Sequence, residues 1–123
     1  MNSWQNDWAY NKYYVMSKSQ NMYNQIRNLA SNNNWNDEKE KEYQELISEA
    51  EHLTPTISSL KNTYQHVWGY FKKKCTKEEK DNYMRLINEV TLEDDELAHF
   101  LKDLTYKYEI KYLINSRLIQ EIK

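Results

Sequence analysis

The sequence predicts an all-α fold, a single compact bundle of five to six helices that forms one domain over residues 1–123. Three observations lead to this prediction. The 123 residues include one glycine and one proline, whereas strand-rich folds need turn residues at short intervals. Apolar residues recur three and four positions apart, as on one face of a helix. An aromatic content of 14% beside a mean hydropathy of -1.07 describes a polar chain whose core depends on large side chains.

The first helix is predicted over about Asn6 to Ser31, after which the polar stretch SNNNWND breaks the chain. Its inward side chains are Tyr10, Tyr14, Met22, Ile26 and Leu29. A second helix is predicted from about Asn36 to Leu53, because Asn36 can cap it and acids in its first turn suit the helix dipole. Its apolar stripe consists of Tyr43, Leu46, Ile47 and Ala50.

The stretch TPT predicts the start of a third helix, with Thr54 as N-cap and Pro55 at the first helical position. This helix extends to about Lys74 and turns inward Ile57, Leu60, Tyr64, Val67, Trp68 and Phe71. The stretch TKEE predicts a capping box in which Thr76 and Glu79 begin a fourth helix. That helix turns inward Tyr83, Leu86, Ile87 and Val90.

The stretch TLEDDE predicts the start of a fifth helix, with inward residues Leu97, Phe100, Leu101 and Leu104. A last helical segment holds Ile110, Tyr112, Leu113, Ile114 and Leu118. The pattern leaves open whether this segment continues the fifth helix or follows a break near Tyr108.

Charge is unevenly distributed along the chain. The formal net charge is -2, but residues 36–51 carry seven acids against two lysines, and residues 70–80 carry five lysines against two glutamates. The overall charge argues against a dedicated nucleic-acid binder, while its distribution leaves room for a basic face. The single cysteine, Cys75, and the lack of a secretory or membrane-spanning pattern indicate a cytoplasmic protein.

Recognisable catalytic chemistry is sparse. His52, His66 and His99 do not have the spacing of metal ligands, and no base can be assigned to Cys75. A single glycine excludes glycine-rich phosphate loops. We therefore expect no metal and no cofactor, and the sequence does not indicate an enzyme.

The one glycine lies in YQHVWGYFKKKCTKEEK, inside a predicted helix. On a helix, His66, Gly69, Tyr70 and Lys73 share a face. A glycine inside a helix costs about 1 kcal/mol relative to alanine, and close approach of a backbone or a ligand usually explains it. Physical reasoning favours a helix packed tightly over Gly69. The other interpretation is a notch, walled by His66 and Tyr70 and rimmed by lysines, that seats a phosphate or a base.

This stretch resembles the YbgA-like family of small bacterial proteins and domains. HVWGYFKKKCTKEEK is similar to the family's central block at His66, Gly69, Tyr70, Phe71, Lys72, Lys73, Glu79 and Lys80. Weaker similarity flanks it through Lys12 and Tyr23 on one side, and through Leu101, Leu104, Tyr112, Leu113 and Leu118 on the other. The chain departs from the family pattern at Asn11, Lys18, Arg27, Ser116 and TLEDDE, where histidines, a glycine, a glutamine and a proline-containing link are usual.

Family members also occur fused to iron–sulfur-dependent desulfidases that act on thiolated uracil or uridine. The resemblance therefore implies a helical domain that holds RNA, in particular tRNA, for the desulfidase. The chain lacks the cysteines that would ligate an iron–sulfur cluster, so it cannot perform that chemistry alone.

We therefore expect a non-catalytic accessory module that binds RNA. The predicted binding residues are Lys12, His66, Gly69, Tyr70, Lys72, Lys73, Lys74, Lys77 and Lys80, with Lys111 and Arg117 in support and Tyr70 or Tyr13 stacked on a base. The alternative is a protein-interaction module that docks a desulfidase or a DNA- or RNA-repair enzyme through the acidic helix or through exposed Trp4 and Trp8. An enzyme acting through His66 is the third hypothesis and has the least support.

Overall fold

The computed structural model describes residues 3–31, 34–93 and 95–123, with the backbone alone for Ser3. Within them the chain forms eight helices and no strand, which confirms the all-α fold. The helices are α1 (Ser3–Lys18), α2 (Gln20–Ala30), α3 (Asp37–His52), α4 (Ile57–Trp68), α5 (Lys77–Glu89), α6 (Glu96–Lys107), α7 (Lys111–Ile114) and α8 (Arg117–Glu121). Parts of the predicted SNNNWND break and of TLEDDE, at 32–33 and 94, lie outside the described residues.

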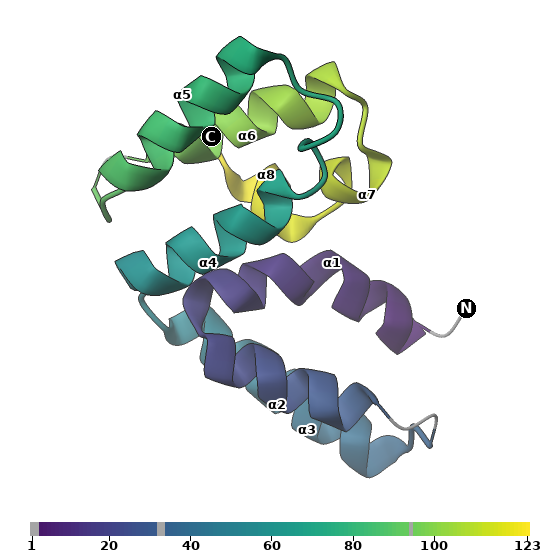
Figure 1. Cartoon of the computed structure of the whole chain (residues 1–123). Coiled ribbons are helices and arrows are strands. Elements are labelled where there is room, and N and C mark those ends of the chain that lie inside the picture. The colour runs from purple at the N-terminus through teal and green to yellow at the C-terminus, as the bar shows by residue number, and fades with distance from the viewer. Residues whose placement is uncertain (1–2, 32–33, 94) are drawn as a thin grey trace.

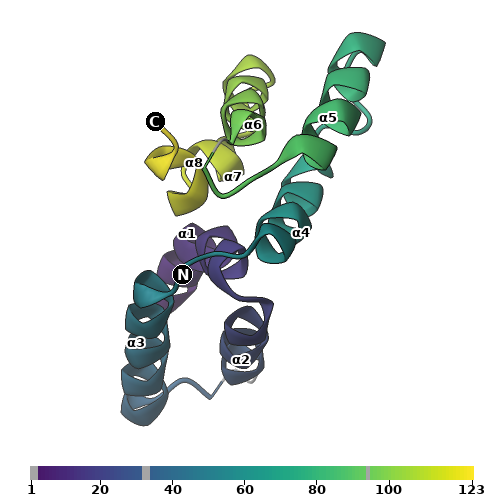
Figure 2. The ribbon, with the colours of Figure 1, turned by 90° about the vertical axis from the view of Figure 1, so that its left-hand side faces the viewer.

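Helix α1 is the centre of the bundle. It packs against α2, α3, α4 and α8. Figure 1 shows the pair α2 and α3 on one side of α1, and α5 and α6 on the other. In Figure 2, α7 and α8 lie between α1 and α6, while α5 continues away from the end of α4. The α4–α5 connection is therefore held at the edge of the bundle.

The predicted first helix is two helices, because the chain breaks at Ser19. The backbone of Ser19 is extended (φ -166°, ψ 121°), and its hydroxyl accepts a hydrogen bond from Met22 N at 3.2 Å. Ser19 thus caps α2 while its own amide still bonds Val15 O at 2.9 Å. The uninterrupted helix predicted over about 6–31 is wrong, because a serine cap competes with helix continuation.

The predicted second helix is confirmed in its bounds and in its buried stripe. Asn36 caps α3 by accepting a hydrogen bond from Lys39 N at 2.9 Å. All four predicted core residues of this helix are buried: Tyr43, Leu46, Ile47 and Ala50. Tyr43 also donates a hydrogen bond to Asp7 Oδ2 at 2.6 Å, which ties α3 to α1.

Helix α4 begins two residues later than predicted, so Thr54 is not its cap and Pro55 precedes it. Thr56 is the N-cap and forms a reciprocal capping box with Ser59, with both bonds at 3.0 Å. The Ser59 hydroxyl also donates to Ser17 O at 2.7 Å. Ser59 therefore serves both the cap and the contact with α1, and this second role favours Thr56 over Thr54.

The predicted fourth helix begins at its predicted cap, and the predicted fifth helix begins at the end of the TLEDDE stretch. Thr76 and Glu79 form the predicted capping box of α5. Asp95 caps α6 by accepting a hydrogen bond from Ala98 N at 3.0 Å, and its second oxygen accepts one from the Tyr64 hydroxyl. The α6 cap is thereby connected to α4.

The chain breaks after α6, which settles the question left open near Tyr108. Glu109 adopts a positive φ of 52°, and Ile110 N bonds back to Thr105 O at 3.1 Å. Two short helices follow instead of one segment. Such reversals favour glycine, so a glutamate at this position hides the break from sequence inspection.

Arg117, at the start of α8, fastens the end of the chain to its beginning. Its guanidinium donates to Asn11 Oδ1 at 3.0 Å, to Glu51 Oε2 at 2.7 Å and to Glu121 Oε2 at 2.7 Å. It also lies over the Tyr14 ring, 3.9 Å from the centroid. Arg117 is thus a structural residue that joins α8 to α1 and α3, and the prediction that it contacts phosphates is wrong.

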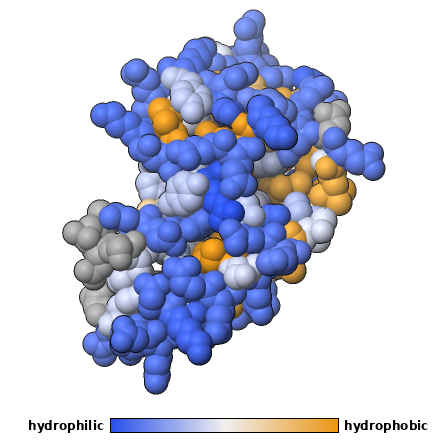
Figure 3. Space-filling model, turned by 180° about the vertical axis from the view of Figure 1, so that it is seen from behind, coloured by the Kyte–Doolittle hydropathy of each residue, from blue (hydrophilic) through white to orange (hydrophobic). Residues whose placement is uncertain are grey.

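Most predicted core positions are buried, and three are exposed. Those three are Tyr10, Ile57 and Tyr112. Leu29, Phe100, Ile110 and Ile114 are half-buried. The face seen in Figure 3 is mostly hydrophilic, with several hydrophobic patches, the largest toward its right edge.

Candidate functional site

The lysine-rich stretch forms a turn between α4 and α5. Helix α4 ends at Trp68, and Gly69 is its C-cap. The next amides bond carbonyls three residues back, as Phe71 N does to Trp68 O at 2.9 Å. Such bonds tighten and end a helix. The prediction that this helix continues to about Lys74 is therefore wrong.

Gly69 does not sit under a packed helix. It has right-handed helical geometry (φ -53°, ψ -28°) and is exposed. A Cβ at this position would lie 3.0 Å from His66 O. Among the described residues other than Gly69 and its two chain neighbours, only the His66 carbonyl group lies within 4 Å of it. The predicted packing of a helix over Gly69 is wrong, and so is a shared helical face with Tyr70 and Lys73, because the helix has already ended.

Replacing Gly69 with alanine is expected to change the free energy of unfolding by less than about 1 kcal/mol, because two effects oppose each other. Alanine restricts the unfolded chain, which stabilises the fold, while its Cβ crowds the His66 oxygen. Urea unfolding of the Gly69→Ala protein measures the sum. A loss of several kcal/mol would mean that another segment does pack on this residue.

Phe71 anchors the turn to the core. Its side chain is fully buried, and its ring lies 6.2 Å from the ring centroids of Trp68 and Tyr108. Its carbonyl accepts hydrogen bonds from Lys74 N and Cys75 N, both at 2.9 Å. One buried side chain therefore positions the backbone that carries the lysines.

The structure brings five of the predicted binding residues together on this turn and the first turn of α5. All five are exposed: Lys72, Lys73, Lys74, Lys77 and Lys80. None of their ammonium groups forms an ion pair with a carboxylate within residues 3–31, 34–93 and 95–123. We name residues 72–80 the lysine turn. Its positive charge is available to an external anion.

A hollow of about 480 Å³ adjoins the lysine turn. Lys72 and Lys80 line it together with Gln65, Trp68, Tyr83 and Met84. The rings of Trp68 and Tyr83 stack with centroids 4.2 Å apart and an interplanar angle of 3°. Both stacked rings are buried, whereas Met84 is the exposed apolar side chain of this lining. Sequence reasoning placed these aromatic residues in the core but missed the hollow.

Glu79 is turned away from the lysines and toward α6. Its carboxylate accepts hydrogen bonds from Thr76 N at 2.9 Å, from Lys107 Nζ at 2.6 Å and from the Tyr108 hydroxyl. Burial raises the pKa of Glu79, but these three donors outweigh it and lower the pKa from 4.5 to about 2. Glu79 is therefore ionised and already engaged, and Glu78 is the other acid of the turn.

Tyr70 and Lys12 belong to a different group of side chains. The Tyr70 and Tyr13 hydroxyls are 3.1 Å apart, and the Tyr70 ring lies 6.2 Å from that of Tyr112 at an interplanar angle of 14°. The Lys12 ammonium lies 5.9 Å from the centroid of the Tyr13 ring. Because Tyr13 is buried, it cannot stack on a base as predicted.

His66 also lies apart from the lysine turn. It is exposed, its Nδ1 lies 2.8 Å from Asn62 O, and it lines a hollow of about 510 Å³ with Lys18 and Ser19. Within the described residues no group of three or more His, Cys, Asp or Glu side chains could hold a metal ion. The predicted site is thus divided among three places.

The residues predicted to form a protein-docking surface, the alternative to RNA binding, are arranged differently from the prediction. Trp4 is buried and stacks on Trp35 at a centroid distance of 4.2 Å, and Trp8 is half-buried against Tyr23. These tryptophans are part of the core, so the prediction that they are exposed is wrong. The acids of α3 remain a solvent-facing row, with exposed members Asp37, Glu38, Glu42, Glu45 and Glu49.

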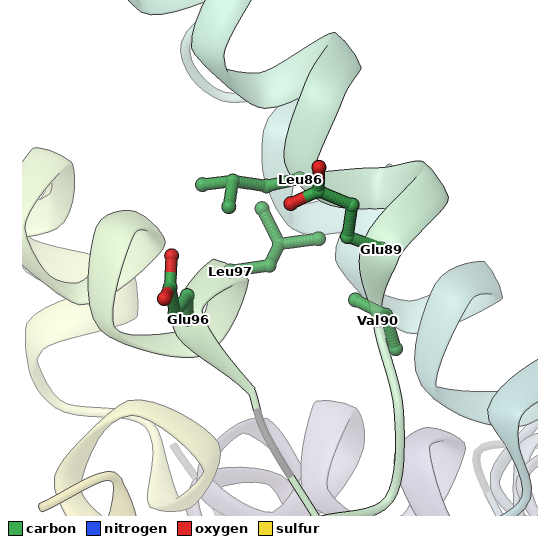
Figure 4. Close-up of a pocket in the computed structure, with 5 residues that line it drawn as sticks. All are labelled: Leu86, Glu89, Val90, Glu96 and Leu97. Carbon is green, nitrogen blue, oxygen red and sulfur yellow. The ribbon is translucent and has the colours of Figure 1, made fainter.

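The pocket between the end of α5 and the start of α6 is too small to be a binding site. Figure 4 shows Leu86, Glu89 and Val90 on one side and Glu96 and Leu97 on the other. Its volume is about 40 Å³, which is room for a few water molecules at most. In the part of the chain that the structure describes, no helix is both long and apolar enough to span a membrane.

Comparison of the chain with known protein families gives a match. Residues 12–122 match the family described as "Protein of unknown function (DUF1722)". The chain belongs to this family. DUF1722 is the YbgA-like family, so the predicted family is confirmed. No curated protein and no solved structure matches the chain.

The departures from the DUF1722 pattern mostly have structural roles. Asn11 is buried and bonds Asp7 and Arg117, while Lys18 donates to Leu53 O at 2.9 Å. Ser116 caps α8. Arg27 differs, because it is exposed and lines a hollow that also contains Lys12.

Proposed function

We propose that this DUF1722 protein binds RNA through the lysine turn. The observation that carries the proposal is the set of five exposed lysines within residues 72–80 that lack ion-pair partners in the described chain. Phosphate contacts from lysine supply most of the affinity of sequence-independent nucleic-acid binding. A chain with a net charge of -2 binds a polyanion only where its positive charge is concentrated.

The geometry of the lysine turn favours contact with the sugar–phosphate backbone of RNA over contact with an RNA base. The lysines project from a turn that Phe71 holds in place, and Glu79 is withdrawn toward α6. Tyr70 packs among tyrosines and is not free to stack on a base. The proposal is therefore a non-catalytic module in the cytoplasm that holds the phosphates of a tRNA-like molecule.

The test is the affinity for total tRNA, measured by fluorescence anisotropy between 50 and 200 mM salt. Changing Lys72, Lys73 and Lys74 to glutamate is expected to weaken binding at least about tenfold and to reduce the salt slope by about 2 or 3. The matched control changes Lys39, Lys41 and Lys123 to glutamate, so the net charge is the same. These residues lie on α3 and at the chain end, away from the turn, and this variant should lose much less affinity.

An equal loss of tRNA affinity in both variants would mean that only the net charge of the protein matters. A tRNA affinity that does not change with salt concentration would contradict phosphate contacts. Either result would overturn the proposal. If the wild type binds no tRNA but co-purifies with a desulfidase or repair enzyme after nuclease treatment, the protein-docking hypothesis replaces it.

A further inference from the structure

A second hollow with basic residues lies between α1, α2 and α7. Its volume is about 390 Å³, and its lining includes Trp4, Trp8, Lys12, Arg27 and Tyr112. Figures 1 and 2 show that α1 separates α2 from α7, so the hollow follows the surface of α1 from one to the other. The volume is within the usual range for small-molecule sites. The lysine turn contributes no residue to it.

Two positively charged side chains line this hollow. Lys12 comes from α1 and Arg27 from α2, and neither pairs with a carboxylate in the part of the chain described. The chain has 19 acids for 17 lysines and arginines, so a shortage of acids does not explain this. Two like charges on one hollow repel each other, and an anion between them removes that repulsion. The hollow is thus suited to a negatively charged ligand.

Aromatic side chains form much of the remaining wall. Tyr112 is 39% exposed, and its hydroxyl donates to Ala9 O at 3.2 Å, which fixes the ring. Trp8 is half-buried. Trp4 Nε1 is buried and, within the described residues, has no hydrogen-bond partner. An acceptor entering at this wall would offset the cost of that unsatisfied donor.

We propose that this hollow binds an aromatic anion, a planar ring that carries a phosphate, as in a mononucleotide. The cations recognise the phosphate, and Trp8 and Tyr112 contact the ring. A simple phosphate would leave the aromatic wall uncovered, and an uncharged ring would leave the cations unpaired. This inference does not depend on RNA binding by the lysine turn.

The test is titration of the full chain with AMP, adenosine and inorganic phosphate, followed by NMR of the tryptophan indole N–H signals. AMP is expected to bind with a dissociation constant of about 1 mM or tighter, and adenosine and phosphate about tenfold more weakly. The signals of Trp4 and Trp8, assigned through single phenylalanine variants, should shift most. The signal of Trp68 should stay in place, because it adjoins the other hollow.

Matched variants distinguish this site from general charge. Lys12→Gln and Arg27→Gln are each expected to weaken AMP binding about tenfold, the loss of one hydrogen bond to a charged group. Changing Lys41 and Lys123, which lie outside the hollow, to glutamine should leave AMP affinity unchanged. All of these variants leave the lysine turn intact. Failure of the tRNA assay would therefore not affect this result.

The inference is overturned if phosphate binds as tightly as AMP, if Lys12→Gln and Arg27→Gln bind like wild type, or if Trp68 shifts in place of Trp8. A 5′-phosphorylated oligonucleotide identifies the source of the ligand. If it binds more tightly than AMP and shifts the same signals, the site takes the end of a nucleic acid, and weaker binding identifies a free nucleotide. Both outcomes retain the phosphorylated ring as the ligand.

Discussion

Replacing Phe71 with alanine is expected to lower the free energy of unfolding by about 3–5 kcal/mol, the usual cost of removing a buried phenylalanine ring. The ring has no exposed surface and packs between Trp68 and Tyr108. Its loss would leave a cavity between α4 and α6, directly beneath the lysine turn. Urea unfolding followed by circular dichroism measures the change.

Met84→Ala is the matched control for Phe71→Ala, because Met84 lines the neighbouring hollow but is 52% exposed. Met84→Ala should change the free energy of unfolding by no more than about 0.5 kcal/mol. If Phe71→Ala also costs less than about 1 kcal/mol, the turn is held by its backbone hydrogen bonds and not by the buried ring. That outcome would contradict the anchoring role of Phe71.

Replacing Glu79 with alanine is expected to lower the free energy of unfolding by about 1–2 kcal/mol, because it removes the reciprocal cap of α5. It also takes away the charged acceptor of the half-buried Tyr108 side chain. The ion pair with Lys107 adds little, since the Lys107 side chain is 56% exposed. Glu79→Gln retains the capping oxygen but not the charge, so its cost should be smaller. Glu78→Ala, next in the sequence and exposed, controls for the loss of an acid in the first turn.

The contribution of Glu79 should also depend on pH. Its folded pKa is about 2, below the ordinary value of 4.5. A carboxyl with a lowered folded pKa stabilises the fold fully above its unfolded pKa and loses that contribution as pH falls through the folded value. The difference in unfolding free energy between wild type and Glu79→Gln should therefore be constant above about pH 5.5 and shrink between pH 4.5 and 2. A constant difference down to pH 2 would contradict the lowered pKa.

Helix starts with reciprocal caps were the most predictable part of the fold. Thr76 with Glu79, and Asn36 before its acids, are local patterns in which the capping groups lie three residues apart. The prediction of Thr54 as a cap was wrong because two threonines flank Pro55. Which of them caps α4 depends on the hydrogen bond from Ser59 to Ser17, 42 positions away. The break at Ser19 was missed because the apolar pattern of the sequence continues across this residue. Long-range contacts of this kind leave no periodic signal.

The candidate site could be predicted only in part for a related reason. The five lysines of the lysine turn lie within nine consecutive positions, so any exposed turn brings them together. Lys12 and His66 were assigned to the same surface through the family resemblance and a helical face that ends at Trp68. The hollow that contains Lys12 and Arg27 depends on how α1, α2 and α7 pack, and the spacing of residues within one helix carries no information about it.

The Arg117 contacts have a consequence for synthesis on the ribosome. Asn11 and Arg117 are separated by 106 positions in sequence, and α8 covers part of α1. A nascent chain that has released α1 to α3 still exposes the surface of α1 that α8 will cover, and contacts this distant in sequence form late. We therefore expect the surface of α1 that faces α8 to remain uncovered until this last segment has left the exit tunnel.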